Sequence, residues 1–184
     1  MPDYRRYFVS GGTYFFTVVT DRRRPFLVEE PARKCLGDAI RKIQRDWPFE
    51  MPAIVLLPDH LHTIWCLPPG DADYETRWRL IKSTFTRTYL AAGGQEARRS
   101  SSRVARKERG LWQRRFWEHT IRDEHDFERH FDYIHYNPVK HRHAKSPIEW
   151  PHSSFHRWVE SGVYDRQWGR SEMKFDDLSN SAME

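Results

Sequence analysis

Two short apolar segments separated by only two residues are the feature that most limits what this chain can fold into. Residues 53–57 (Ala-Ile-Val-Leu-Leu) are followed by Pro58-Asp59 and then by residues 60–67 (His-Leu-His-Thr-Ile-Trp-Cys-Leu). Such residues favour strands, and a connection this short can join only antiparallel neighbours. The sequence therefore predicts a tight hairpin, and with it an antiparallel sheet.

The remaining segments alternate between strand and helix patterns. β-branched and aromatic residues predict strands, apolar residues at helical spacing predict helices, and Pro138 is expected to end the last long helix, which Asp123 caps. The expected elements are strands at 13–20 and 111–121, helices at 31–46, 74–92 and 124–136, and a short helix at 153–160. This order predicts an α+β fold, a ferredoxin-like antiparallel sheet with helices packed on one face.

Length and composition are those of one globular domain. The chain has 184 residues, of which only 38% are hydrophobic, but aromatic residues make up 15% and supply enough area for a core. No apolar run approaches the roughly 20 residues of a membrane span, and no signal-peptide pattern opens the sequence, so we expect a cytoplasmic protein. We expect a single domain over residues 1–170, a flexible basic loop over 93–110, and an acidic, disordered tail over 171–184.

The charge pattern favours a nucleic-acid partner. The sequence has 31 Lys and Arg residues against 26 Asp and Glu, a net charge of +5, and most of the cations are arginines. Guanidinium groups match phosphate oxygens and stack on aromatic rings. Ordinary solvated surface charge is the alternative, and a plain linker is the alternative for the loop 93–110. The two cysteines, Cys35 and Cys66, are too few for a disulfide framework or a four-cysteine zinc site.

His60 and His62 are the first candidates for chemistry. Residues two apart in a strand point to the same face, so both imidazoles are expected to project together from an otherwise apolar strand. Two such imidazoles suit a divalent metal, whereas a structural pair satisfied by its neighbours is the alternative. A second pair, His141 and His143, lies among cations that would repel a metal ion. We therefore interpret the spacing of this second pair as a coincidence and not as a metal site, and expect these two histidines to contact phosphate instead.

The predicted helix at 124–136 offers the second set of candidates. Tyr133 and Asn137 are four residues apart and share a helix face, with His130 one turn earlier. Taken alone, Tyr133 would be a packing residue and Asn137 a C-terminal cap. A catalytic role for these two residues becomes a serious alternative to packing and capping only if this helix face lies against the histidine pair.

Several segments together resemble a known family. Residues 57–62 (Leu-Pro-Asp-His-Leu-His) and 133–140 (Tyr-Ile-His-Tyr-Asn-Pro-Val-Lys) resemble the REP-associated tyrosine transposases, single-tyrosine HUH enzymes related to small insertion-sequence transposases. Further matching segments lie at 4–7, 11–16, 77–79, 112–119, 150–151 and 153–156. The resemblance covers about residues 4–168, and the loop 93–110 and the acidic tail depart from it.

The resemblance implies roles for individual residues. It implies that Tyr133 is the nucleophile and that His60 and His62 bind Mg²⁺ or Mn²⁺. Asn137 is implied as a third ligand, because it lies where insertion-sequence relatives often have a glutamine. Tyr136, three residues further on, is the alternative nucleophile.

The expected function is metal-dependent cleavage and rejoining of single-stranded DNA at palindromic repeat hairpins, through a 5′-phosphotyrosine. We expect a monomer with hairpin DNA as its partner and no small-molecule cofactor. The residues expected to contact DNA are Arg5, Arg6, Arg77, Arg79, Arg114 and Arg115. One alternative is a hairpin-binding protein of the same fold that does not cleave. Another is an unrelated metallohydrolase, which would leave the basic surface unexplained.

Overall fold

A four-stranded antiparallel sheet forms the centre of the protein, in a computed structural model that describes residues 8–173 and 175. β1 lies inside the sheet and pairs with β3 and β4, and β2 pairs with β3. The strands are β1 (Thr13–Val19), β2 (Glu50–Leu56), β3 (His60–Cys66) and β4 (Trp117–Thr120), in the order β2-β3-β1-β4. The predicted hairpin and antiparallel sheet are confirmed, although the predicted extended segment 111–121 is a strand only over β4.

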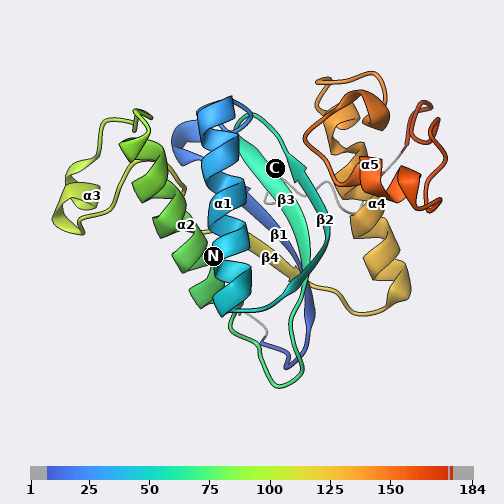
Figure 1. Ribbon diagram of the computed structural model, residues 1–184, viewed down its shortest axis with the longest axis horizontal. Helices are drawn as coiled ribbons and strands as arrows, with labels where there is room; N and C mark the ends of the chain where they lie inside the picture. The colour runs from blue at the N-terminus through green and yellow to red at the C-terminus, as the bar shows by residue number, and fades with distance from the viewer. Residues whose placement is uncertain (1–7, 174, 176–184) are drawn as a thin grey trace.

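Helices lie on both sides of this sheet (Figure 1). The helices are α1 (Glu30–Asp46), α2 (Tyr74–Ala91), α3 (Ser101–Ala105), α4 (Glu124–Lys140) and α5 (Phe155–Glu160), with 3-10 turns η1 (Asp21–Arg23) and η2 (Pro147–Glu149). The α+β class is confirmed, and α1 and α2 cover one face of the sheet as predicted. α4 packs against the opposite face, which differs from the expectation that all helices share one face.

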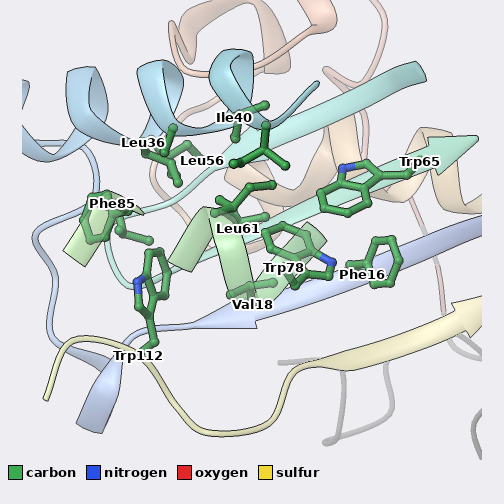
Figure 2. Close-up of a cluster of buried hydrophobic side chains, with 14 of the residues drawn as sticks. Phe16, Val18, Leu36, Ile40, Leu56, Leu61, Trp65, Trp78, Phe85 and Trp112 are labelled. Atoms are coloured by element: carbon green, nitrogen blue, oxygen red, sulfur yellow. The ribbon is translucent and has the colours of Figure 1, made fainter. Parts of the chain in front are cut away.

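The two faces of β1 explain why two layers of helices are needed. Figure 2 shows Phe16 and Val18 packed with the large side chains of the α1 and α2 side, including Trp65 and Trp78. Phe15, the residue before Phe16, points to the opposite face and belongs to a second buried cluster that α4 contributes to. Because side chains alternate along a strand, an unbroken run of apolar residues exposes apolar surface on both faces unless both are covered.

Helix α4 begins where the sequence predicts and ends later. Asp123 Oδ1 accepts a hydrogen bond from the backbone N–H of Asp126 at 2.8 Å, which confirms the predicted N-cap. The helix continues through Pro138 to Lys140, so the prediction that Pro138 ends it was wrong. A proline this close to the C-terminus removes only one helical hydrogen bond, and His141 N still donates to Asn137 O at 3.0 Å. The added turn places Lys140 on the same helix as Tyr133.

The segment 93–110, expected to be a flexible basic loop, contains α3 and is hydrogen-bonded to η1. Arg103 Nη2 lies 2.6 Å from Asp21 Oδ1 and also donates to Trp112 O at 3.0 Å. Arg22 and Arg24 donate to the backbone carbonyls of Arg98 and Gln95. The expected acidic tail falls largely on residues 174 and 176–184, outside the described residues. Within the described chain, no helix has the length and apolar character needed to cross a membrane.

Candidate functional site

The two histidines of β3 lie together on the face of the sheet that α4 covers. His60 and His62 are 1% and 0% exposed, with ring centroids 4.9 Å apart and ring planes at 79°. Neither Nε2 atom has a hydrogen-bond partner within the described part of the chain. A buried polar atom without a partner is costly, so these two nitrogens have the character of ligand atoms.

The other ring nitrogen of each histidine is held by a hydrogen bond. His60 Nδ1 lies 2.6 Å from Asp59 Oδ1, and His62 Nδ1 lies 2.9 Å from Thr17 Oγ1. Because an ionised carboxylate only accepts, His60 carries a proton on Nδ1, and in the neutral ring the lone pair is on Nε2. Burial, together with the charges of neighbouring groups, lowers the pKa of His62 well below its usual value. His62 is therefore neutral, which is the form that binds metals.

One face of α4 runs along this histidine pair. Tyr133, Asn137 and His141 follow one another at four-residue spacing. The Tyr133 ring lies 5.4 Å from the His62 ring, and the His141 ring lies 5.2 Å from the His60 ring. Asn137 is between them on the helix face, fully buried, and its side-chain amide has no hydrogen-bond partner among residues 8–173 and 175. The structure thus brings together the four residues whose catalytic and metal-binding roles the sequence predicts.

Two neighbouring side chains of this site were not assigned to it from the sequence. The sequence places His141 only in a second pair, with His143, whereas in the structure its ring lies beside that of His60. Lys140 Nζ lies 3.4 Å from Tyr133 Oη and 4.8 Å from the centre of the Tyr133 ring. The signal for His141 was present in the four-residue spacing from Tyr133 through Asn137. It required the helix to continue through Pro138.

Tyr136, the alternative nucleophile, has different surroundings. Its hydroxyl accepts a hydrogen bond from Met173 N at 3.3 Å, and its ring packs edge-on against Trp168. Tyr133 instead packs against His62 and Phe15 on the sheet. The geometry therefore favours Tyr133 over Tyr136.

A second group of titratable side chains lies nearer the start of α4. His119, Asp126 and His130 offer ligand atoms within 4.8 Å of one another, close enough for one metal ion. The two imidazole rings are stacked, 4.5 Å apart and 15° from parallel. Imidazole lone pairs lie in the ring plane, so stacked rings direct them along separate planes, whereas the 79° angle between His60 and His62 lets theirs converge. The ring geometry is therefore more favourable for a shared metal ion at the His60 and His62 pair than at His119 and His130.

In this second group, Asp126 instead serves as a hydrogen-bond acceptor. His119 Nε2 lies 2.8 Å and His130 Nδ1 3.1 Å from its carboxylate, and Arg122 N donates to it at 3.0 Å. Although burial raises the pKa of Asp126, these hydrogen bonds and charges lower it to about 2. The group therefore fastens β4 to the first turns of α4.

Comparison with known proteins identifies the family. The family described as "Transposase IS200 like" matches residues 8–137. The REP-associated tyrosine transposase of Escherichia coli strain K12 is 45% identical over 168 residues, which cover 91% of each chain. The chain belongs to the family of REP-associated tyrosine transposases. A solved structure of a REP-associated tyrosine transposase bound to a REP hairpin shares 44% identity, covers 96% of each chain and superposes with a TM-score of 0.79. Tyrosine transposases are enzymes that cleave and rejoin DNA.

The transposase has a basic groove between α2 and the segment 103–116. Its volume is about 1010 Å³, and Trp78, Trp112 and Phe116 contribute aromatic side chains to its wall. Three of the arginines predicted to contact DNA line this groove, namely Arg79, Arg114 and Arg115, with Lys82, Arg87, Arg103, Arg106, Lys107 and Arg109 as further cations and Glu75 and Glu108 as the acids. The groove concentrates positive charge beside the partly exposed Phe116, whereas Trp78 and Trp112 are almost fully buried behind it.

The structure corrects the prediction for Arg77. This side chain is 0% exposed, and its guanidinium pairs with Asp71 at 2.6 Å while donating to the carbonyls of Trp47, Pro48 and Asp73. Arg77 therefore anchors α2 of the transposase, and its side chain is too buried to contact DNA. The other two predicted contacts, Arg5 and Arg6, lie outside the described residues.

Proposed function

We propose that the chain is a metal-dependent single-strand DNA endonuclease and strand transferase that acts at palindromic repeat hairpins through a 5′-phosphotyrosine intermediate. The observation that supports this most is the meeting of the Tyr133 ring with His62, whose Nε2 is buried without a partner within the described chain. Membership of a family of tyrosine transposases supports it independently.

His60, His62 and Asn137 would hold the metal ion. Two imidazole nitrogens and an amide oxygen, all buried and lacking hydrogen-bond partners in the described part of the protein, fit Mg²⁺ or Mn²⁺. When bound, the ion would polarise the scissile phosphate and help to orient it. Asp59 and Thr17 hold the two rings in place through their Nδ1 atoms.

Tyr133 would attack the phosphorus atom of a single strand. A bond forms between Tyr133 Oη and phosphorus, the bond from phosphorus to the 3′ oxygen breaks, and that oxygen leaves as a 3′-hydroxyl after taking up a proton. A tyrosine hydroxyl is normally protonated at neutral pH, so its proton must be lost in the step. The Lys140 ammonium group near Oη stabilises the negative charge that develops there. Attack of a 3′-hydroxyl on the phosphotyrosine reverses the step and rejoins the strand.

The DNA would be held by the basic groove. Arg79, Arg114 and Arg115 are exposed there, and a relative has been solved in complex with a REP hairpin. Guanidinium groups over aromatic side chains suit both phosphates and unpaired bases. We also propose that Arg5 and Arg6 contact the DNA and that the protein binds it as a monomer.

The alternative, a hairpin-binding protein that does not cleave, is favoured by one observation. Tyr133 is 1% exposed, so its hydroxyl must become accessible before it can meet a phosphate. Detection of a covalent adduct between protein and DNA separates the two functions.

The first prediction concerns that adduct. A single-stranded hairpin oligonucleotide, labelled at its 3′ end and incubated with the protein and Mn²⁺, should yield a labelled protein band that resists denaturation. Tyr133→Phe should abolish this band while leaving hairpin affinity within about twofold, because only the attacking oxygen is removed. Tyr136→Phe is the matched control, and it should retain the band.

Two results would contradict this assignment. An adduct formed by Tyr133→Phe but not by Tyr136→Phe would move the nucleophile to Tyr136. Hairpin binding by the unaltered protein without any adduct, at every Mn²⁺ concentration tried, would favour the protein that binds hairpins without cleaving them.

A further inference from the structure

We propose that Arg23 and Asp59 form a positioning pair that fixes the tautomer and orientation of the His60 ring. The proposal rests on the proposed function in one respect, that His60 is a metal ligand. It concerns two residues to which neither the sequence pattern nor the family resemblance gave a role.

The pair is a chain of three side chains with one hydrogen bond at each link. His60 Nδ1 meets Asp59 Oδ1 at 2.6 Å, and Arg23 Nη1 meets Asp59 Oδ2 at 2.9 Å. Each carboxylate oxygen has its own partner, so the carboxylate cannot rotate without breaking one of the two bonds. Side-chain exposure increases from 2% at His60 to 20% at Asp59 and 41% at Arg23. The chain therefore leads from the buried ligand to the surface.

The backbone of η1 is strained in a way that serves this pair. Arg22 and Arg23 both adopt the left-handed conformation, with φ of 55° and 51°, which non-glycine residues seldom adopt. Thr20 holds the turn, because its hydroxyl lies 2.9 Å from the carbonyl oxygens of both Arg24 and Asp59. Its backbone N–H also donates to Asp59 O at 2.9 Å. Thr20 thus ties the turn to the residue next to His60.

Within this turn, the side chains divide between two directions. Asp21 pairs with Arg103, and Arg22 and Arg24 donate to backbone carbonyls of the segment 95–98. Arg23 alone among these four residues bonds to Asp59. The same turn therefore joins the surroundings of His60 to the segment that forms one side of the basic groove.

The carboxylate determines which nitrogen of His60 is free. Asp59 can accept a hydrogen bond but not donate one, so it holds the proton on Nδ1 and keeps the lone pair on Nε2. The opposite oxygen of the same carboxylate is paired with the Arg23 guanidinium at 2.9 Å. This ion pair favours the carboxylate form of Asp59. Without this partner the ring can exchange tautomers and rotate.

Metal affinity is the first test. Mn²⁺ binding to the full chain, measured by loss of the free-ion electron paramagnetic resonance signal, should weaken roughly 10- to 100-fold in Asp59→Asn. Arg23→Met should weaken it by a smaller factor, because Asp59 remains but can rotate, and Arg23→Lys should recover part of the loss. Arg24→Met is the matched control, since Arg24 bonds to Gln95 O instead, and it should bind Mn²⁺ as the unaltered protein does.

The tautomer in the metal-free protein is the second test, and it does not depend on metal binding. Long-range ¹H–¹⁵N correlation spectra should show His60 as the Nδ1–H form in the unaltered protein and in Arg24→Met. They should show a mixture of forms in Asp59→Asn. A folded Asp59→Asn variant with both the original tautomer and the original Mn²⁺ affinity would overturn the proposal.

The two tests also separate this proposal from the proposed function. If the unaltered protein binds no Mn²⁺, the proposed metal chemistry fails, while the His60 tautomer still decides whether Asp59 positions the ring. If Asp59→Asn does not fold, the Mn²⁺ affinity of the surface variant Arg23→Met supplies the test, because that variant keeps Asp59 but frees it to rotate. Unchanged Mn²⁺ affinity in folded Arg23→Met would then overturn the role of the pair.

Discussion

At the scale of single residues, His60 and His62 differ in what holds their rings. His60 is held by a carboxylate, and His62 by the Thr17 hydroxyl on the neighbouring strand. The two rings are nevertheless similar in their burial and in the free Nε2 atom. The site thus combines one charged and one neutral support for two chemically identical groups.

Substitution of the metal-binding side chains gives the second prediction. His60→Ala and His62→Ala should each abolish cleavage of the hairpin and weaken Mn²⁺ binding at least tenfold, because each removes an imidazole from a set of three donors. Asn137→Ala should have a smaller effect, since an amide oxygen contributes less to divalent affinity. Calorimetric titration with Mn²⁺ measures all three. Cleavage by the unaltered protein that EDTA leaves unchanged would instead make His60 and His62 a phosphate-binding pair.

Arg77 gives the third prediction. Arg77→Met should lower the free energy of unfolding by about 3–5 kcal/mol, because it leaves buried carbonyl groups and Asp71 without their partner. Hairpin affinity measured well below the unfolding transition should be unchanged, since the guanidinium lies away from the surface. A stable Arg77→Met variant that binds hairpins weakly would restore the DNA contact that the sequence suggested.

At the scale of elements, the basic groove gives the fourth prediction. Arg106 and Lys107 are exposed on its α3 side, so the double variant Arg106→Gln, Lys107→Gln should weaken hairpin binding and reduce the slope of log affinity against log salt by about 1.5. The double variant Lys42→Gln, Arg45→Gln removes the same charge from exposed positions of α1, away from the groove. It should change the slope much less. Equal slopes for both variants would remove the groove from the binding surface.

Most elements could be predicted because the signals for them are local. Apolar periodicity, the Pro58-Asp59 break and the Asp123 cap each act over a few neighbouring residues, and the strands and helices follow them closely. The end of α4 could not be predicted from Pro138 alone. Its continuation places Lys140 and His141 against Tyr133 and His60, contacts that depend on the fold. Tertiary packing here outweighs a local signal.

The candidate site divides in the same way. His60, His62 and Tyr133 are recognisable from spacing and from the family resemblance. Their supports, Thr17 and Arg23, come from other elements, and only strand pairing and the shape of η1 bring them near. Arg77 carries the same charge as the arginines of the groove, and its burial depends on where α2 packs. Residue type shows what a side chain can do, and the fold determines what it touches.

At the scale of the whole molecule, buried histidines couple folding to pH, which gives the fifth prediction. Burial lowers the pKa of His130 to about 4 and that of His135 to about 3. In the unfolded chain both take up a proton near pH 6.5, so the unfolded state binds more protons below that pH. The contribution of these two neutral histidines to the free energy of unfolding is therefore fully present above about pH 6.5. It is lost as the pH falls, by roughly 2 kcal/mol per histidine at pH 5.

Urea unfolding at constant ionic strength measures this effect. The midpoint should fall steadily between pH 7 and pH 5. His135→Gln should be less stable than the unaltered protein at pH 7 but should lose less stability on acidification, because one of the buried proton-binding groups is gone. A midpoint that does not change over this range would show that both rings are protonated in the folded state.

The pairing of β1 with β3 places Val19 opposite His60 and Thr17 opposite His62. One residue inserted within β3, between His60 and His62, would put the two imidazoles on opposite faces of the strand and turn one of them toward the cluster of Trp65 and Trp78. Insertions at residues 92–100, in the connection between α2 and α3, leave the strands in phase. Over evolutionary time, descendants of this gene should therefore differ in length at that connection. They should keep the spacing between the two histidines of β3 unchanged, even where the residue between them has been replaced.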